Sequence, residues 1–373
     1  MSYKTAISKR LTFLPELICG WYDKNQRDLP WRKDKNPYHV WVSEIMLQQT
    51  RVEAVKAYYV RFTDELPSIA DLAACPEDRL LKLWEGLGYY TRVRHMQEAA
   101  KRIVKEHGGQ LPSDYQKLLK LPGIGSYTAG AVASIAFSIP VPAVDGNVLR
   151  IVARFMADDR DVLKSSVRKE TELILTDVLK DCSRAGDFNQ GLMDLGAMVC
   201  LPSTRPLCEK CPLQEDCEAH LQKREIELPV RGKPKTRRIE KRTILLIRDG
   251  ERVALTKRPD KGLLAGMYEF PNLEGACSDT EVLKYVKKQG LEPLRIRPLK
   301  PAKHLFSHVE WQMTGFEIQV AEFTEMSAED NGSLWILAGI REIEASYPIP
   351  SAYKAYADHI RLCLGVKNEQ LIS

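Results

Sequence analysis

The hydrophobic positions in the first 220 residues recur with helical spacing. Residues 40–47 form a strongly apolar stretch, and residues 78–85 and 93–106 carry apolar side chains three and four positions apart. Residues 128–137 combine alanine and glycine with larger apolar side chains, which suits a closely packed, buried helix. Proline and glycine separate these stretches. The pattern predicts a mostly helical N-terminal domain.

The last third of the chain changes to the pattern of β-strands. Short runs rich in branched side chains occupy residues 243–247, 252–256 and 313–320, and a turn signal at residues 249–250 separates the first two runs. A stretch with helical character, residues 280–289, lies between them. The pattern predicts a second domain of the α+β class.

A basic segment punctuated by proline lies between the two patterns. It carries Arg231, Lys233, Lys235, Arg237 and Arg238 with Pro229 and Pro234, and no acidic residue intervenes. A chain of 373 residues is also longer than one core comfortably holds. We therefore expect a helical domain over residues 1–220, a linker over residues 221–240 and a second domain over residues 241–373.

Composition excludes some classes of protein. The net charge of +5 permits nucleic acid as a partner without indicating it. No apolar run approaches the roughly 20 residues that a membrane span needs, and no secretory signal is visible. Four of the nine cysteines crowd into residues 200–217 and the others are scattered. That distribution favours metal binding in a reducing cytosol over a disulfide framework.

The cysteine cluster is the most specific motif of the chain. Cys200, Cys208, Cys211 and Cys217 are separated by seven, two and five residues. Four thiolates this close in sequence suit either zinc or a cubane iron–sulfur cluster. Structural zinc sites usually have two short Cys-x(2–4)-Cys pairs and only one is present, so the spacing favours [4Fe–4S].

Two glycines form a tight turn before the small-residue stretch. Gly123 and Gly125, within residues 121–130, are expected to leave backbone N–H groups free at a helix N-terminus, which makes a phosphate site. Taken alone, the motif equally describes an ordinary helix-turn-helix.

Two carboxylates stand out by their surroundings. Glu44 has such apolar neighbours that burial would raise its pKa and let it hold a proton near neutral pH. Its spacing alone is better explained as a charge at a helix N-terminus after Ser43. Asp145 follows the glycine turn by about twenty residues, and a helix cap is the simplest role for it. Capping and catalysis are compatible.

The glycine turn, the following aspartate and the trailing cysteines together resemble the helix-hairpin-helix DNA glycosylases of the endonuclease III superfamily. The resemblance covers residues 10–220. Members of that superfamily that also cleave the strand carry a lysine nucleophile inside the glycine turn, and this chain has Tyr127 in that slot. The resemblance therefore implies a monofunctional enzyme.

Four segments resemble the MutY-type adenine DNA glycosylases in particular: residues 29–32, 43–50, 84–92 and 121–130. By this resemblance, an all-α helix-hairpin-helix glycosylase domain holds a [4Fe–4S] cluster on the cysteine loop, residues 200–217, and a Nudix-like α+β domain follows. The family commonly has six residues between its first two cluster cysteines, where this chain has seven.

The resemblance also assigns roles. Glu44 is the general acid that protonates adenine at N7, and Asp145 stabilises the cationic sugar, as in two-carboxylate glycoside chemistry. Tyr127 and Asn147 support these two groups. The resemblance also places seven residues against the DNA: Arg32, Gln49, Thr50, Leu87, Tyr89, Gly123 and Gly125. Of these, Gln49, Thr50, Leu87 and Tyr89 are expected to wedge into the duplex while adenine is flipped out.

The second domain resembles the Nudix fold without its hydrolase motif. Residues 262–271 match a Nudix segment, but residues 272–290 lack the Arg-Glu-x-x-Glu-Glu run that would hold Mg²⁺. The adenine glycosylases read 8-oxoguanine with a Phe-Ser-His motif, found here as Phe306, Ser307 and His308. Taken alone, these three residues are more simply explained as the start of a β-strand with a capping serine. In this context we expect Ser307 to bond the N7–H and O8 edge of the lesion.

The resemblance thus implies hydrolysis of the N-glycosidic bond of adenine opposite 8-oxoguanine or guanine. Its partner is double-stranded DNA with such mispairs, and we expect a monomer in the bacterial cytoplasm, associated with the nucleoid and not with membrane. The nearest alternative is a thymine or uracil glycosylase of the same fold, acting on G:T or G:U mismatches. A Nudix hydrolase tethered to a DNA-binding module lacks its glutamates. A non-catalytic iron–sulfur DNA-binding protein leaves Glu44 and Asp145 unexplained.

Overall fold

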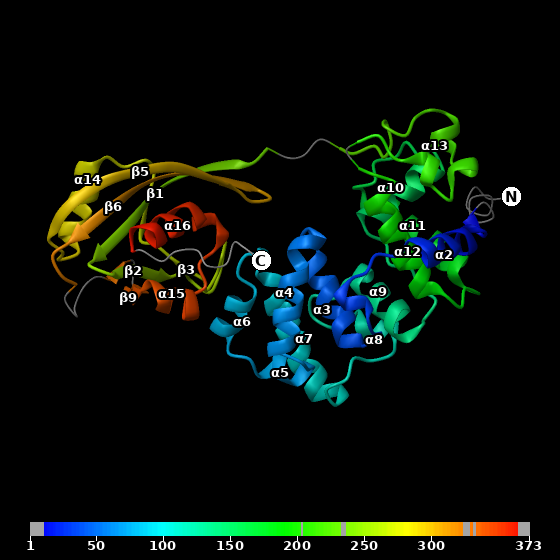
Figure 1. The fold of residues 1–373 in the computed structure, drawn as a ribbon, viewed down its shortest axis with the longest axis horizontal. Coiled ribbons are helices and arrows are strands. Elements are labelled where there is room, and N and C mark those ends of the chain that lie inside the picture. Colours follow the sequence, from blue (N-terminus) through cyan, green and yellow to red (C-terminus); the bar gives the residue numbers. More distant parts are fainter. Residues whose placement is uncertain (1–10, 203, 233–235, 324–328, 331–332, 365–373) are drawn as a thin grey trace. The chain divides into compact units, whose positions relative to one another are not determined.

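The computed structural model divides the chain into two compact units (Figure 1). One comprises residues 1–75 and 91–233, and the other residues 76–90 and 234–373. The structure describes all residues except 1–10, 203, 233–235, 324–328, 331–332 and 365–373. Lys233 and Lys235 of the expected linker therefore lie outside the described residues.

The first unit is built from helices. They are α2 (Leu14–Asn25), α3 (Pro37–Leu47), α4 (Val52–Glu65), α5 (Ile69–Ala74), α7 (Thr91–His107), α8 (Tyr115–Leu118), α9 (Ser126–Phe137), α10 (Gly146–Phe155), α11 (Ser165–Leu179), α12 (Ala185–Met198) and α13 (Glu218–Leu221), with short 3-10 turns at Pro30–Arg32, Cys208–Lys210 and Gln214–Asp216. The helices predicted at residues 40–47, 93–106 and 128–137 are confirmed as α3, α7 and α9.

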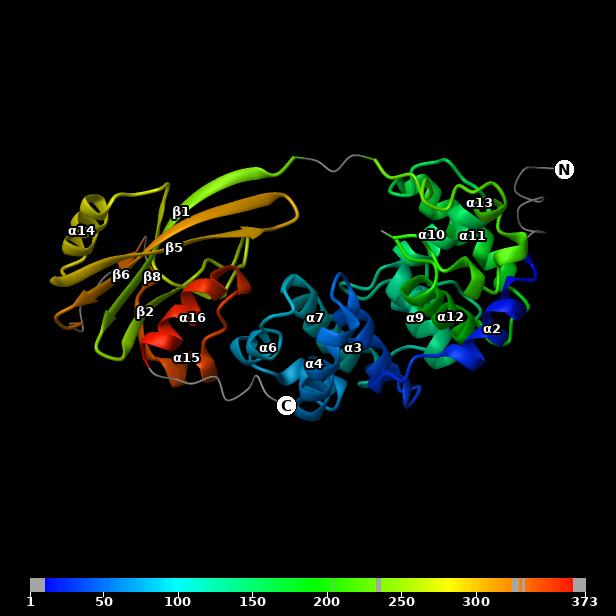
Figure 2. The same cartoon turned by 45° about the horizontal axis from the view of Figure 1, so that its top comes forward.

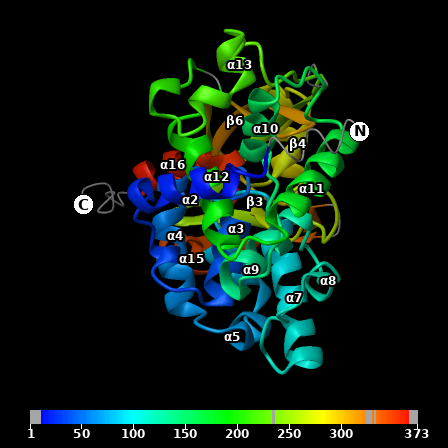
Figure 3. The same cartoon turned by 90° about the vertical axis from the view of Figure 1, so that its right-hand side faces the viewer.

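Helix α9 lies at the centre of this unit and packs against α3 and α12 (Figure 3). Its small side chains permit the close approach. A Cβ at Gly186 of α12 would lie 2.7 Å from the carbonyl oxygen of Ser134 in α9, and a Cβ at Gly130 of α9 would lie 2.1 Å from the carbonyl oxygen of Pro142 in the segment before α10. No larger residue fits at either position without moving the backbone. This packing brings together helices that are far apart in sequence.

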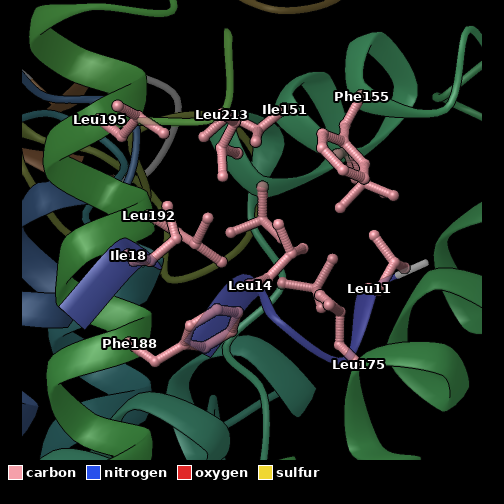
Figure 4. Packing of buried hydrophobic residues seen from close by; sticks show 14 of the residues in the cluster. Leu11, Leu14, Ile18, Ile151, Phe155, Leu175, Phe188, Leu192, Leu195 and Leu213 are labelled. Carbon is pink, nitrogen blue, oxygen red and sulfur yellow. The ribbon is translucent and has the colours of Figure 1, made fainter. Parts of the chain in front are cut away.

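One hydrophobic cluster joins α2, α10, α11 and α12 (Figure 4). Ile18, Phe155 and Leu195 are almost fully buried in it, and Leu213 of the cysteine loop packs into the same cluster. Burying each such side chain contributes about 1.5–3 kcal/mol. The cluster therefore fixes the start of α10, the face of α12 and the cysteine loop as one body.

The second unit is a mixed β-sheet with helices on both faces. Its elements are α6 (Glu77–Leu83), β1 (Arg238–Asp249), β2 (Arg252–Lys257), β3 (Tyr268–Glu269), β4 (Asn272–Glu274), α14 (Asp279–Lys288), β5 (Pro293–Leu305), β6 (Val309–Val320), β7 (Glu329–Asp330), β8 (Ser333–Leu334), β9 (Ile336–Gly339), α15 (Ile340–Ser346), a 3-10 turn at Ser351–Tyr353 and α16 (Lys354–Cys363). The main sheet has the order β3-β2-β1-β6-β5, with β4 added to β1 and β9 to β2. Strands β1 and β6 are parallel, and the other described pairs are antiparallel.

Alternation along β1 explains the three layers. Ile244 and Leu246 belong to the core under α15 and α16, whereas Leu245 and Ile247 belong to the core under α14. Successive strand side chains point to opposite faces, so the apolar run of β1 serves both cores. Figure 2 shows α14 and α16 on opposite sides of the sheet. The predicted strands at 243–247, 252–256 and 313–320, the helix at 280–289 and the fold class are confirmed.

Candidate active site

A cavity of about 180 Å³ opens among α3, α9, α10 and α12 of the first unit. Its described walls hold all four predicted catalytic side chains together with apolar ones. The lining residues are Arg27, Leu29, Trp31, Arg32, Val40, Ser43, Glu44, Leu47, Thr50, Val52, Tyr127, Ile135, Asp145, Asn147, Gln190, Met193 and Ala197. Glu44 and Asp145, a hundred residues apart in sequence, thus line one cavity.

Glu44 is a buried acid with one defined partner. It is 4% exposed and lies in the second half of α3, so the interpretation as a helix N-terminal charge is wrong. The helix begins at Pro37, and its N-terminus is capped by the side chain of Asn36. The hydroxyl of Tyr127 donates to Oε2 of Glu44 at 2.5 Å. Burial raises the pKa of Glu44 to about 7, although the bond from Tyr127 and the charge of Arg32 oppose the rise.

Arg92 holds the C-terminal end of the helix that carries Glu44. Its Nη1 donates to the carbonyl oxygens of Ile45, Met46 and Gln48 at 2.6, 3.2 and 2.7 Å. Those carbonyls have no partners within the helix, and a cation there is also favoured by the helix dipole. Arg92 therefore fixes the end of the helix that positions Glu44.

Asp145 caps α10, as its position in the sequence predicts. Its Oδ1 accepts from the backbone N–H groups of Asn147 and Val148, both at 2.8 Å. Its Oδ2 accepts from Nδ2 of Asn147 at 2.7 Å. Burial raises the pKa of Asp145, and these same bonds act against the rise. A carboxylate held by three donors at a helix N-terminus is fixed in place and faces the cavity.

Asn147 is itself locked in orientation. Nη2 of Arg150 donates to Oδ1 of Asn147 at 2.9 Å and to the carbonyl oxygen of Gly196 at 2.8 Å. A Cβ at Gly196 would lie 2.6 Å from Cβ of Asn147, so only glycine leaves room for this side chain. The amide is thereby oriented with its NH₂ toward Asp145.

Arg32, predicted to contact DNA, is engaged by a buried acid. Its Nη1 and Nη2 meet Oδ2 and Oδ1 of Asp194 at 2.7 and 2.9 Å, and Nε of Arg27 meets Oδ1 at 2.7 Å. The side chain of Asp194 has no exposed surface. Sequence reasoning missed Arg27 and Asp194, although an acid inside an apolar stretch is the same signal that drew attention to Glu44.

The glycine turn joins α8 to α9. Gly123 has a φ of +70°, and a Cβ there would lie 2.6 Å from Cβ of His95. Gly125 occupies the N-cap of α9 in an extended conformation. Without a side-chain cap, the first N–H groups of α9 stay available to a phosphate oxygen.

The chain is similar to known DNA repair enzymes over nearly its whole length. Residues 42–176 match the HhH-GPD superfamily of base excision DNA repair proteins, and residues 243–359 match the NUDIX domain. The adenine DNA glycosylase of Rattus norvegicus is 34% identical over 95% of this chain and 80% of its own length. The chain belongs to the adenine DNA glycosylase family.

Other relatives agree with this assignment. The adenine DNA glycosylase of Buchnera aphidicola from Schizaphis graminum is 31% identical over 86% of this chain and 91% of its own. The solved structure of a thermostable thymine-DNA glycosylase is 28% identical, with a TM-score of 0.51, over 57% of this chain and 98% of that one. The predicted resemblance to the MutY-type enzymes is confirmed, and this glycosylase acts on adenine in DNA. None of the helices in its described part combines the length and hydropathy of a membrane span.

The four cysteines of this adenine glycosylase line a second cavity of the first unit, together with Arg154. Nη1 of the buried Arg154 donates to Sγ of Cys200 at 3.2 Å. Among the described residues, which include all four cysteines, no three of the sulfurs lie within 4.8 Å of one another. Four thiols around one cavity are a donor set that an iron–sulfur group can use.

Burial favours the protonated form of three of these thiols, those of Cys208, Cys211 and Cys217. It raises the pKa of Cys208 to about 11 and that of Cys211 to about 12, and neighbouring sulfurs add to the effect. Thiolate is the form that ligates metal. Metal binding would thus release protons from this loop and couple its folding to the metal.

The predicted DNA-wedge residues have different surroundings. Gln49 and Tyr89 both have positive φ angles, +60° and +48°. Thr50 lines the active-site cavity. Leu87 and Tyr89 belong to the segment 76–90 of the second unit, where Leu87 is buried and Tyr89 is 48% exposed.

The Phe-Ser-His motif lies at the turn between β5 and β6. Phe306 packs edge-on against Trp311 at 4.9 Å between ring centres, while Ser307 and His308 are exposed. Oγ of Ser307 lies 3.2 Å from Nδ1 of His308. The phenylalanine thus anchors the turn and leaves two polar side chains facing outward.

Proposed function

We propose that this enzyme hydrolyses the N-glycosidic bond of adenine mispaired with 8-oxoguanine or guanine, with Glu44 as general acid. The observation that carries the proposal is the pKa of Glu44, about 7 in a cavity that also holds Asp145. An acid of this strength donates a proton efficiently near neutral pH. Protonation at N7 turns adenine into a neutral leaving group.

The hydrogen bond from Tyr127 to Glu44 assigns the proton of the neutral acid to one oxygen. Oε2 accepts from Tyr127, so the proton of the neutral acid resides on Oε1. After transfer to N7, the Tyr127 bond stabilises the carboxylate that remains. Tyr127 is thus a support for the acid in both of its states.

Asp145 supplies the negative charge for the sugar. As the adenine bond lengthens, positive charge develops on the sugar, and a fixed carboxylate stabilises it because no reorganisation is required. Its three hydrogen bonds supply that fixation. Asn147 acts through Asp145 by orienting Oδ2.

The enzyme is proposed to be monofunctional. Of the described residues that line the cavity, none is a lysine, and the residue in the glycine-turn slot, Tyr127, is bonded to Glu44. Schiff-base chemistry at the sugar needs an amine. Base release should therefore leave an intact strand with an abasic site.

We propose a [4Fe–4S] cluster on Cys200, Cys208, Cys211 and Cys217. The cluster would supply the covalent cross-link that fixes the loop on the core under α10 and α12, where Arg154 donates to Cys200. Cys208→Ser should lower the iron bound per chain, and unchanged iron would count against this ligand set.

The second unit is proposed to read 8-oxoguanine. Ser307 is exposed and carries a hydroxyl that donates and accepts, which suits the N7–H and O8 edge of the lesion. Nudix hydrolysis is disfavoured because Glu281, the glutamate of α14, is bound in a capping box with Ser278. Ser307→Ala should reduce the preference for 8-oxoguanine over guanine while adenine release opposite guanine persists.

A thymine or uracil glycosylase is the second candidate, because the thymine-DNA glycosylase structure shares the fold of the first unit. Pyrimidines have no N7, so a buried acid in the place of Glu44 would have no acceptor of this kind. The two substrates are separated by the same experiment.

That experiment is single-turnover base release, with and without alkali, from duplexes with adenine opposite 8-oxoguanine, guanine or thymine and from duplexes with guanine opposite thymine or uracil. We expect strand breaks only after alkali, release fastest opposite 8-oxoguanine, and loss of release in Glu44→Gln. Breaks without alkali would refute monofunctionality. Release of thymine or uracil and not adenine would refute the substrate while leaving the fold intact.

A further inference from the structure

Three side chains of the second unit converge in a group that the glycosylase chemistry does not use. Glu317 comes from β6, and His359 and Cys363 come from α16. His359 and Cys363 are four residues apart, so they share one face of the helix. Their ligand atoms and a carboxylate oxygen of Glu317 all lie within 4.8 Å of one another.

The spacing of these atoms matches a tetrahedral metal. Nε2 of His359 lies 3.1 Å from Oε2 of Glu317 and 3.4 Å from Sγ of Cys363. Metal–ligand bonds of about 2.0 Å to nitrogen or oxygen and 2.3 Å to sulfur give tetrahedral edges of about 3.3 and 3.6 Å. Two of the three edges of the group are thus close to those of a tetrahedral zinc site, and the third is within 4.8 Å.

The carboxylate is already oriented for ligation. Glu317 is 5% exposed, and Nε of Arg248 donates to its Oε1 at 2.7 Å, which leaves Oε2 toward His359. Buried ligand carboxylates are held in this way by outer hydrogen bonds. The charges of a zinc ion, the Glu317 carboxylate, the Cys363 thiolate and the Arg248 guanidinium add up to +1, and the site is open to water.

The exposed side of the group leaves room for a fourth ligand. Cys363 is exposed, and the His359 side chain is 35% exposed. Three protein ligands with an open position are typical of zinc sites that exchange a water or a further ligand. An ion pair of His359 with Glu317 explains two members of the group but not the sulfur beside them.

We propose that Glu317, His359 and Cys363 form a zinc site that clamps α16 to the sheet. Nitrogen, oxygen and thiolate together favour zinc over magnesium or calcium, which take oxygen ligands. The site is distinct in residues from the four cysteines of the first unit and from the Phe-Ser-His motif. Binding forms a sulfur–zinc bond and releases the thiol proton to solvent.

The test uses the full-length, iron-loaded enzyme dialysed against zinc in a buffer with a weak competing chelator. Zinc and iron per chain are measured by elemental analysis, and labelling of Cys363 by a maleimide is followed by peptide mass spectrometry. The variants are Cys363→Ser and His359→Gln. Cys277→Ser is the matched control, because Cys277 is a partly exposed thiol of the same unit that donates to the carbonyl oxygen of Glu274 and lies outside the proposed group.

We expect one zinc per chain without loss of iron, in the wild type and in Cys277→Ser. Zinc should slow labelling of Cys363, and each ligand variant should weaken binding by at least the roughly 10–100-fold that outer-shell changes produce. Equal zinc in Cys363→Ser and wild type, zinc gained only as iron is lost, or labelling of Cys363 at the same rate with and without zinc would each overturn the proposal.

Discussion

Replacing Tyr127 by phenylalanine removes one hydroxyl from the active-site cavity and little else. That hydroxyl donates to Glu44 at 2.5 Å and favours the ionised acid. Without the bond, the carboxylate of Glu44 loses its partner in a buried site, and the pKa of Glu44 must rise further. Phenylalanine keeps the ring and so the packing of α9 against α3.

The size of this change follows from the strength of the bond. A hydrogen bond to a charged group contributes about 1.5–3 kcal/mol, and 1.36 kcal/mol corresponds to one pH unit. Starting from about 7, the pKa of Glu44 should therefore rise by about one to two pH units. At pH 8 the protonated fraction would grow from about a tenth to about half or more.

The assay is the pH dependence of single-turnover adenine release. Since Glu44 must be protonated to act, the alkaline limb of the profile should move to higher pH by the same one to two units. The plateau should fall, because a weaker acid transfers its proton less readily. Tyr347→Phe is the matched control, because Tyr347 bonds Glu342 in the second unit. An alkaline limb that stays in place or moves to lower pH would refute the reasoning.

Three further changes test the supports of the site. Gly196→Ala should displace Asn147, because the new methyl group would lie 2.6 Å from its Cβ. Base release should slow more than tenfold while DNA affinity changes little. A normal rate of base release would contradict the packing argument. Glu44→Gln should raise the free energy of unfolding by about 3 kcal/mol above pH 7. In the wild type, folding raises the pKa of Glu44 from 4.5 to about 7, so above pH 7 the folded protein holds a costly buried charge that glutamine lacks. This gain in stability should vanish as the pH falls below 4.5, because Glu44 is then neutral in both the folded and the unfolded protein. Urea titrations at several pH values measure it. A gain at low pH only would show that the pKa of Glu44 is shifted in the opposite direction. Asp194→Asn leaves Arg32 buried without a carboxylate and should cost about 3–5 kcal/mol, seen as a lower urea midpoint; an unchanged midpoint would show that the pair contributes nothing.

The sequence by itself determined the features that depend on neighbours along the chain. Periodicity of apolar side chains predicts α3, α7 and α9 and the strands β1, β2 and β6, because burial on one face imposes a repeat of 3.6 or 2 residues. The spacing of four cysteines and the glycine turn are likewise local, and so is the capping by Asp145, which spans only three residues. These signals sufficed for the fold class and the family.

Only the tertiary structure decided what lies against what. Glu44 is buried beside Tyr127, 83 residues away, and that contact sets both its environment and its partner. Arg32 is engaged by Asp194, 162 residues away, so its positive charge is part of the cavity wall. Glu317 meets His359 only because α16 packs on the sheet. Local patterns do not encode such pairs, since a contact between distant segments depends on how whole helices and strands pack.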